Sequence, residues 1–209
     1  MKRGKFITFE GCEGVGKSTQ IALLREYFQD NGIKALFLRE PGGSKISEEI
    51  RKLILSTDSV GMTKECEALL YSASRAQLIG QVIRPALERG EIVVCDRFTD
   101  STFAYQGVAR GLGEDYVDSL NKLACGEVMP DLTIFLDLEP KLGFARKGGA
   151  DKDDRIEQEN RAFHDEVYRG YKIACDRYEG RIVAIDASGE ISQVHEAIIR
   201  TLQRRGIVD

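Results

Sequence analysis

The chain has 209 residues, of which 42% are hydrophobic and 31% charged, values typical of a soluble globular protein. Its 30 basic and 34 acidic residues give a net charge of −4, which argues against a long nucleic acid or an anionic membrane as partner. The five cysteines contain no CxxC pair, and no apolar run is long enough to span a bilayer. We therefore expect one cytoplasmic domain, residues 1–209, without a disulfide framework or a zinc site.

Short apolar runs alternate with longer amphipathic stretches along the whole chain. The runs predict strands at Lys5–Glu10, Ala35–Arg39, Ile92–Asp96, Thr133–Asp137 and Ile182–Asp186. The stretches predict helices at Ser18–Asn31, Lys45–Leu55, Lys64–Glu88, Asp115–Ala124, Gln158–Asp176 and Ile191–Arg204. Because the runs show little alternation, the strands should be covered on both faces, which indicates an α/β three-layer domain with a parallel sheet.

The segment after the first predicted strand matches the phosphate-binding motif GxxxxGK[ST] at every fixed position. Its glycines allow the backbone amides to wrap around phosphate oxygens, and the helix that follows adds a favourable dipole. Lys17 can reach the β- and γ-phosphates, and the Ser18 hydroxyl can bind Mg²⁺. The segment therefore predicts an ATP site formed by Gly11, Cys12, Glu13, Gly14, Val15, Gly16, Lys17, Ser18 and Thr19.

A phosphate loop alone does not specify the reaction. A GTPase needs a guanine-reading NKxD motif, and Asn121–Ala124 begins as NK but ends in alanine inside a predicted helix. Large ATPases commonly carry two acids after the third strand, whereas this chain has Asp96 followed by Arg97. An arginine beside an acid that lies near the metal favours a second anionic substrate.

Three arginines are placed to form that second anion site. Arg39 begins the segment Arg39-Glu40-Pro41-Gly42-Gly43 after the second strand, Arg97 follows the third strand, and Arg51 lies on the helix between them. Ligands of α/β sheets bind at the carboxyl edge, where these segments emerge. Because the planar guanidinium group of arginine forms bidentate hydrogen bonds with phosphate oxygens, we expect the phosphate of the acceptor to bind at this edge.

Two further features suit a nucleobase. Tyr71 and Arg75 are four residues apart on a predicted helix and share a face, so a ring and a guanidinium can meet one base. The segment from Thr99 to Gly107 is rich in hydrogen-bonding side chains for its place beside a core strand.

These segments, in this order, resemble the thymidylate kinase family. The resemblance rests on FEGCEGVGKST at 9–19, REPGG at 39–43, YSASR at 71–75, DRF at 96–98 and AYQG at 104–107, with PDLTIFLD at 130–137 and DRIEQE at 154–159. It implies a nucleoside monophosphate kinase fold with a lid, and phosphorylation of dTMP to dTDP by ATP in dTTP biosynthesis. It also implies Mg²⁺ as cofactor and a homodimer.

The resemblance assigns roles to single residues. Lys17 and Arg97 would act on the transferring group, Ser18 and Asp96 would lie near the metal, and Glu13 would lie near the sugar hydroxyl. The acceptor would be bound by Arg39, Glu40, Pro41, Arg51, Tyr71, Arg75, Arg97, Thr102, Tyr105 and Gln106. Within that set Tyr71 would stack on thymine, and Tyr105 would crowd the 2′ position and favour deoxyribose.

The lid is expected at residues 146–155, RKGGADKDDR, which are too polar to form a core. The phosphate loop holds no arginine, so the chain resembles the branch of the family that carries its catalytic arginine in the lid, as is common in bacteria. Arg146 and Arg155 are both candidates for that role. His164 and His195, which have no facing ligand sets, are interpreted as structural.

Two other functions stay open at this level. One is a kinase for a different nucleotide or a deoxynucleoside, which Tyr71, Arg75 and Gln106 would distinguish. The other is a nucleotide-binding module without phosphoryl transfer, which Lys17 and the second anion site argue against.

Overall fold

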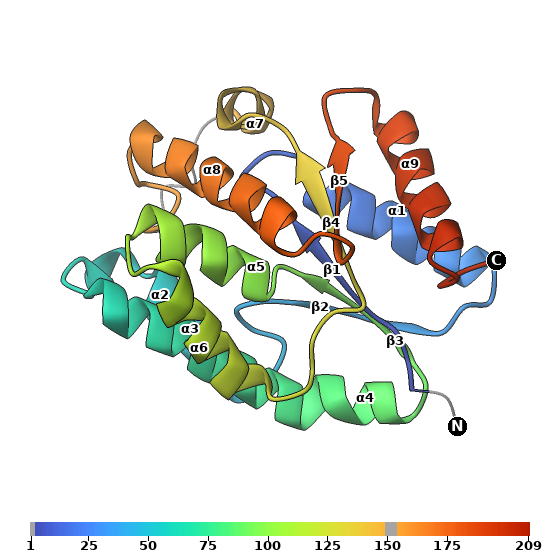
Figure 1. Ribbon diagram of the computed structural model, residues 1–209, viewed down its shortest axis with the longest axis horizontal. Helices are drawn as coiled ribbons and strands as arrows, with labels where there is room; N and C mark the ends of the chain where they lie inside the picture. The colour runs from blue at the N-terminus through green and yellow to red at the C-terminus, as the bar shows by residue number, and fades with distance from the viewer. Residues whose placement is uncertain (1–2, 149–153) are drawn as a thin grey trace.

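The computed structural model describes residues 3–148 and 154–209 of the chain. Five parallel strands form one sheet in the order β2-β3-β1-β4-β5 (Figure 1). Their bounds are β1 Phe6–Glu10, β2 Ala35–Arg39, β3 Ile92–Asp96, β4 Leu132–Asp137 and β5 Ile182–Asp186. The five predicted strands and the parallel sheet are thereby confirmed, with shifts of one residue at two strand starts.

Helices cover both faces of the sheet. One face packs against α1 (Lys17–Asp30) and α9 (Ile191–Arg204), and most of the remaining helices lie on the other side (Figure 1). Those are α2 (Lys45–Leu55), α3 (Lys64–Leu78), α4 (Arg84–Glu88), α6 (Glu114–Cys125) and α8 (Arg161–Arg177). The central strand β1 is buried at all five positions, as expected for a parallel strand between two helical layers.

The register brings the ends of neighbouring strands together. Phe9 of β1 pairs with Asp96, the last residue of β3, and Arg39 of β2 pairs with the same aspartate. The loops after β1, β2 and β3 therefore leave one edge of the sheet side by side. This is the carboxyl edge at which α/β sheets bind ligands.

The helix predictions are largely right, with two omissions. The expected helix Lys64–Glu88 is helical throughout but is divided into α3, the π-helical η2 (Ile79–Ile83) and α4. The polar segment after β3, for which no helix was predicted, forms α5 (Thr99–Thr102) and the π-helical η3 (Phe103–Ala109). A short 3-10 helix, η1 (Thr57–Ser59), follows α2.

The second omission is α7 (Pro140–Lys147), which the sequence pattern did not indicate. Arg146 and Lys147, expected to begin the lid, form the last turn of this helix. Residues 149–153 of the expected lid lie outside the described part of the chain. The helix predicted from Gln158 begins instead at Arg161, because Asn160 caps it by accepting a hydrogen bond from the Phe163 amide at 3.0 Å.

Candidate active site

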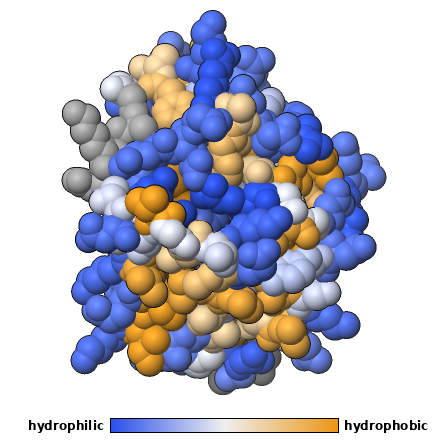
Figure 2. Space-filling view, turned by 90° about the vertical axis from the view of Figure 1, so that its left-hand side faces the viewer, coloured by the Kyte–Doolittle hydropathy of each residue, from blue (hydrophilic) through white to orange (hydrophobic). Residues whose placement is uncertain are grey.

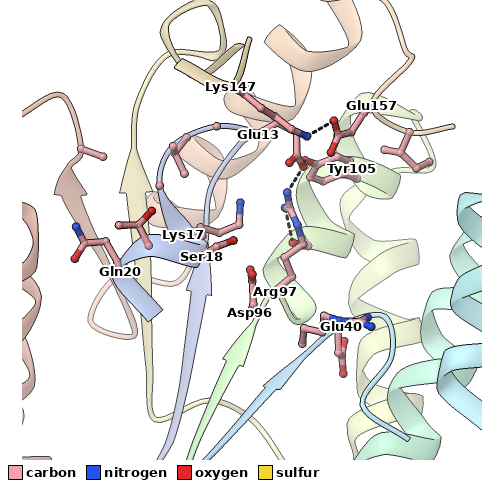
Figure 3. Close-up of a pocket in the computed structure, with 18 of the residues that line it drawn as sticks. Glu13, Lys17, Ser18, Gln20, Glu40, Asp96, Arg97, Tyr105, Lys147 and Glu157 are labelled. Atoms are coloured by element: carbon pink, nitrogen blue, oxygen red, sulfur yellow. Dashed lines mark hydrogen bonds and ion pairs between the residues drawn. The ribbon is translucent and has the colours of Figure 1, made fainter. Parts of the chain in front are cut away.

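A cavity of about 860 Å³ opens at the carboxyl edge of the sheet (Figure 3). Its walls come from the phosphate loop, the loops after β2, β3 and β5, helices α2 and α3, and the end of α7. The cavity therefore joins segments from almost the full length of the chain. It is large enough for a nucleotide-sized ligand.

The phosphate loop has the backbone that close phosphate binding needs. Gly14 and Gly16 have positive φ angles of 71° and 95°, which residues with a Cβ atom rarely adopt. Gly16 directly precedes α1, so the amides at the start of this helix face the cavity. The local sequence thus gives the backbone conformation that an anion site needs before any tertiary contact is considered.

Helix α7 lies directly against this loop through a pair of glycines. A Cβ atom at Gly14 would be 2.0 Å from the Gly143 carbonyl oxygen, and one at Gly143 would be 2.2 Å from the Glu13 carbonyl oxygen. Only two residues without side chains permit this distance. The end of the predicted lid is consequently held close to the predicted phosphate site.

Lys17 lies at the floor of the loop, 8% exposed. Its Nζ donates to the carbonyl oxygens of Gly11 at 2.9 Å and Cys12 at 3.0 Å. Burial, together with the nearby Arg97 cation, lowers the pKa of this amine. The ammonium is therefore positioned where an added negative charge would stabilise it strongly.

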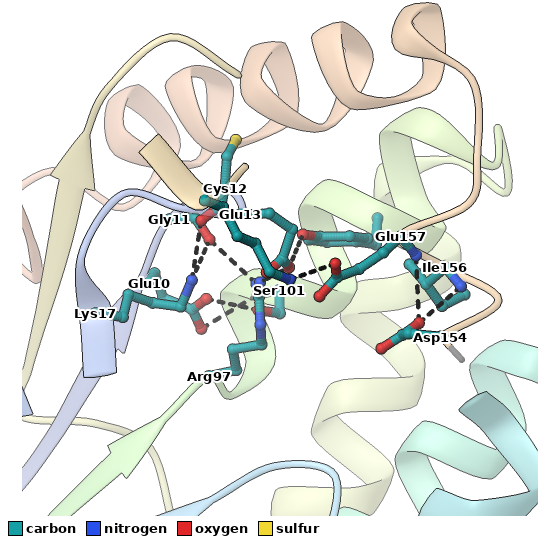
Figure 4. Close-up of polar contacts among 12 residues, drawn as sticks. Glu10, Gly11, Cys12, Glu13, Lys17, Arg97, Ser101, Asp154, Ile156 and Glu157 are labelled. Atoms are coloured by element: carbon teal, nitrogen blue, oxygen red, sulfur yellow. Dashed lines mark hydrogen bonds and ion pairs between the residues drawn. The ribbon is translucent and has the colours of Figure 1, made fainter. Parts of the chain in front are cut away.

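Arg97 connects the phosphate loop with the far side of the cavity (Figure 4). Its backbone has φ of 67°, unusual for a residue other than glycine, and this turns the side chain back across the end of β1. The guanidinium donates to the Gly11 carbonyl at 3.2 Å and to Tyr171 at 3.0 Å, and it pairs with Glu13. It also lies over the Tyr105 ring, 5.2 Å from the centroid.

Glu13 is the acid of the phosphate loop, and it faces both of these cations. Burial by itself would raise the pKa of its carboxyl, but Arg97 and Lys17 outweigh burial and lower the pKa to about 2. The Tyr105 hydroxyl donates to the same carboxylate at 3.2 Å. Glu13 is thus an anion held between the phosphate loop and Tyr105.

Glu10, at the end of β1, holds the residues around Arg97 in place through hydrogen bonds. The buried carboxylate of Glu10 accepts hydrogen bonds from the Phe98 amide at 2.7 Å, the Ser101 hydroxyl at 2.6 Å and Tyr171 at 2.9 Å. Burial and the nearby Asp100 raise the pKa of Glu10 to about 7. Since these bonds fix the residues that follow and contact Arg97, Glu10 stabilises the unusual backbone there.

The residues expected near a metal have suitable chemistry. Ser18 and Asp96 both line the cavity, and the Asp96 Oδ1 atom is buried without a hydrogen-bond partner. Mg²⁺ is commonly bound by one or two protein oxygens together with phosphates and water. In the described residues no three acidic, cysteine or histidine side chains form a metal cluster, so the site suits a metal that arrives with a phosphate ligand.

Arg39 and Arg51 meet at the loop after β2. Both guanidiniums donate to the Pro41 carbonyl oxygen, at 2.9 Å and 3.0 Å. Glu48 accepts from Arg39 at 2.9 Å and from the Gly43 amide at 2.7 Å, which holds the loop against α2. Two cations therefore line the cavity at the position that the sequence pattern indicated for an acceptor phosphate.

Arg75 is the largest fully buried polar side chain at the other end of the cavity, 1% exposed. Its Nε donates to Glu40 at 2.8 Å, and its Nη1 donates to Thr102 at 3.0 Å and Asn121 at 2.9 Å. Burial raises the pKa of Glu40 to about 7, although the Arg75 cation opposes this. Asn121, which begins the NK pair, therefore contacts Arg75 inside the protein.

Gln106 and Tyr71 complete this end. Gln106 is 2% exposed and donates through Nε2 to Glu67 at 2.9 Å. Tyr71 lies half-buried one turn before Arg75 on α3. All four side chains that the sequence predicts for the base, Tyr71, Arg75, Thr102 and Gln106, line the same cavity.

The two lid arginines occupy different places. Arg146 lines the cavity and donates to the carbonyl oxygens of Ala187 at 2.7 Å and Ser188 at 2.9 Å. Arg155 does not line the cavity, and it donates instead to Glu67 at 2.7 Å and to the Ile54 carbonyl at 3.1 Å. Of these two arginines, only Arg146 therefore lines the cavity. Lys147, in the expected lid, pairs with Glu157, which follows that segment in the chain (Figure 3).

The structure brings together nearly all of the predicted site residues. Gly11 and Cys12 lie beneath the cavity surface, because their side of the loop is buried, and Arg155 is directed away. Sequence analysis missed the wall formed by Ala187, Ser188, Gly189, Glu190, Ile191 and Val194, and also Gln20 and Asp154. The loop after β5 could have been found, since it leaves the same carboxyl edge as the phosphate loop.

The remaining observations concern the two histidines, the cysteines and membrane-spanning helices. His164 and His195 are partly or fully covered by packing, and rings of Phe144 and Phe163 flank His164. All five cysteines are free thiols. Among the described residues, no helix is long and apolar enough to cross a membrane.

Comparison with known proteins gives one consistent family. The thymidylate kinase family model matches residues 9–198 of the chain. A curated thymidylate kinase from Lactobacillus delbrueckii subsp. bulgaricus is 47% identical over 204 residues, covering 96% of each chain. Those from Finegoldia magna and Clostridium novyi are 45% and 44% identical and cover 97% and 95% of this chain and 100% and 98% of their own.

Proposed function

The chain belongs to the thymidylate kinase family, whose members transfer a phosphoryl group from ATP to dTMP to give dTDP, and we propose which of its residues perform each part of that reaction. The observation that carries the proposal is the position of Arg97. It contacts the phosphate loop through Gly11 and Glu13 and lies over Tyr105 on the acceptor side of the same cavity. A group that joins both halves can act on a phosphoryl group passing between them.

The donor side would be the phosphate loop and the wall after β5. The loop amides and Lys17 would bind the β- and γ-phosphates of ATP. To do so, the Lys17 ammonium would exchange its two loop carbonyls for phosphate oxygens. Ser18 and Asp96 would hold Mg²⁺, which neutralises phosphate charge during transfer. The loop Ala187–Gly189, held by Arg146, would border the adenine.

The acceptor side would hold the two ends of dTMP separately. Arg39, Arg51 and Arg97 would surround its 5′-phosphate with three cations. Tyr71 would stack on the base, while Arg75 and Gln106 would meet its polar edge. Tyr105 and Glu13, which already share a hydrogen bond, would lie at the sugar, where the tyrosine ring leaves little room for a 2′-hydroxyl.

The transfer would proceed in line, directly from ATP to the acceptor phosphate. The acceptor oxygen is already negatively charged near neutral pH, since a phosphate monoester has a second pKa of about 6, so a strong general base is unnecessary. The main task is to align two polyanions and to stabilise the charge on the transferring group. Lys17 and Arg97 are the described cations best positioned for this. A lid that closes over ATP would also exclude water.

We further propose that the protein acts in the cytoplasm as a homodimer. Helices α2, α3 and α6 expose large apolar side chains, among them Ile46, Leu53, Leu69 and Leu123. Figure 2 shows apolar residues gathered over the lower half of the face on which these helices lie. A second copy would cover them. Light scattering on the purified protein should give twice the mass of one chain.

The most direct test of the assigned roles is Arg97→Ala. Arginines that stabilise the transition state in related phosphoryl transfers contribute about 10³- to 10⁵-fold, so kcat for dTMP phosphorylation should fall by at least about 10³-fold. The control is Arg89→Ala, which removes a largely exposed arginine paired with Glu91 and outside the cavity. Near-normal turnover of a folded Arg97→Ala protein would refute the role given to Arg97.

A further inference from the structure

Glu67 is a buried acid that does not line the cavity, and the reaction described above gives it no role. It lies on α3, 1% exposed, and its carboxylate receives four hydrogen bonds. Oε1 accepts from Gln106 at 2.9 Å and from Arg110 Nε at 3.1 Å. Oε2 accepts from Arg110 Nη2 at 3.2 Å and from Arg155 at 2.7 Å.

Two arginines keep this carboxyl ionised. Burial by itself would raise the pKa of Glu67, but hydrogen bonds and charge from Arg110, Gln106 and Arg155 lower it below its ordinary value. An ionised carboxylate only accepts hydrogen bonds. The part of the Gln106 side chain that faces it must therefore be the NH₂ group, because an amide oxygen in that place would be repelled. The orientation of the Gln106 amide is thus fixed by charge.

The opposite atom of the amide, Oε1, is then the one available to a ligand in the cavity. An acceptor at this place suits a ring N–H, which thymine and uracil carry at N3. Cytosine has an unprotonated N3, so it would place one acceptor against another. Arg75 is held in a parallel way by Glu40 and offers a donor, which suits a base carbonyl such as O4 and disfavours the cytosine amino group.

We propose that Glu67 is a specificity-determining positioning residue, which orients Gln106 so that the cavity selects pyrimidine monophosphates with an N3–H over those without it. The proposal rests on the proposed role of Gln106 in binding the base. It assigns the choice between dTMP and dCMP to a residue that touches neither. Arg110 and Arg155 act on the same choice by holding the carboxylate in place.

Glu67→Gln should reverse the orientation of the Gln106 side-chain amide. The new amide oxygen would take the place of Oε2, which accepts from both Arg110 and Arg155. The NH₂ would take the place of Oε1, where it would face Gln106 and lose the hydrogen bond from Arg110 Nε. Gln106 would then turn its own oxygen to that NH₂ and present NH₂ to the base. Mispairing a buried hydrogen-bonding group commonly costs about tenfold or more. The ratio of kcat/KM for dTMP to that for dCMP should therefore fall by about tenfold.

Two comparisons separate this effect from simple damage. The ratio for dTMP to dUMP should stay unchanged, because both bases carry N3–H, and the KM for ATP should stay unchanged. Glu159→Gln is the matched control, since Glu159 also pairs with Arg110, at 2.5 Å, but is not bonded to Gln106. It should keep the wild-type dTMP to dCMP ratio.

Steady-state kinetics of both variants with dTMP, dUMP and dCMP give the kcat/KM ratios that test this role of Glu67. A folded Glu67→Gln protein that loses activity equally on dTMP and dCMP would overturn the proposal. If that variant does not fold, Glu67→Asp keeps the charge but withdraws it from Gln106 by one methylene, and an unchanged ratio there would also overturn it. A wild-type protein that does not distinguish dTMP from dCMP would instead refute the proposed role of Gln106 itself.

Discussion

The two sides of the cavity, which we assign to the phosphoryl donor and to the acceptor, are built in different ways. The proposed donor side depends on one continuous segment, residues 11–19, whose backbone has positive φ angles at Gly14 and Gly16 directly before α1. The proposed acceptor side collects Arg39, Arg51, Arg75 and Gln106 from the end of a strand and three helices. Arg75 and Gln106 are held by Glu40 and Glu67, partners that are distant in sequence. A phosphate can be bound by backbone amides, whereas a base must be read by side chains of fixed orientation.

This difference decides what a substitution does in each region. On the donor side the critical feature is how closely α7 approaches the phosphate loop. On the acceptor side it is the charge of the buried carboxylates that hold Arg75 and Gln106. The largest effect in either region should follow when both are disturbed at once, as at Arg97. Changes confined to one side should be smaller and should affect one substrate only.

Gly143→Ala tests the donor side alone. A methyl group there would lie 2.2 Å from the Glu13 carbonyl oxygen, so α7 or the loop must shift. Displacing a binding loop by a fraction of an ångström to one ångström can cost ten- to a hundredfold. We expect kcat/KM for ATP to fall by about tenfold, while the dTMP to dCMP preference is retained. The matched control is Gly80→Ala, a glycine of η2 with open space around it.

Kinetics with varied ATP at saturating dTMP measure this effect. An unchanged kcat/KM for ATP in Gly143→Ala would show that α7 does not constrain the phosphate loop. A loss of base preference in the same variant would show that the two sides are not independent.

Glu10→Gln should give the smallest effect, on stability. Because the folded-state pKa of Glu10 is about 7 against 4.5 in its ordinary state, the folded protein binds one proton more between these values. The free energy of unfolding should therefore fall as pH rises from about 5 to 7, by up to about 1.4 kcal/mol per pH unit from this group. The neutral glutamine removes that contribution, so the pH dependence should become shallower.

Urea unfolding of the wild type and of Glu10→Gln at pH 5, 6 and 7 measures the difference. If both proteins lose stability with the same slope, Glu10 does not change its protonation in this range. The supporting role of Glu10 beneath Arg97 would then rest on its hydrogen bonds alone.

The sequence predicted the sheet and most helices because parallel strands read as apolar runs and helices as amphipathic stretches. It missed α7, whose eight residues contain three arginine or lysine side chains, one glycine and one proline, a weak helical signal. It also missed η3, since Phe103–Ala109 is buried through contacts that no local pattern reveals. Predictions of local structure therefore failed where the local signal is weak or where tertiary packing decides the conformation.

The site shows the same limit. The phosphate loop and the arginines after successive strands could be found, since both follow from position along the chain. Glu67 and Glu10 could not, because an acid in a helix or strand gives no sign that distant side chains will surround it. The place of Arg155 was equally hidden, since its contact with Glu67 spans 88 residues of sequence.

We propose that one cavity transfers a phosphoryl group from ATP to a nucleotide whose base is selected by two side chains. Arg75 would donate a hydrogen bond to that base, and Gln106 would accept one from it. The measurement that tests it most directly is the initial rate of ADP release with ATP and Mg²⁺, comparing dTMP, dUMP, dCMP, dAMP, dGMP, GMP and no acceptor. We expect the fastest turnover with dTMP, slower turnover with dUMP, and little ADP release with the other nucleotides or without an acceptor. Equal ADP release without an acceptor, or equal rates with dTMP and dCMP, would contradict it.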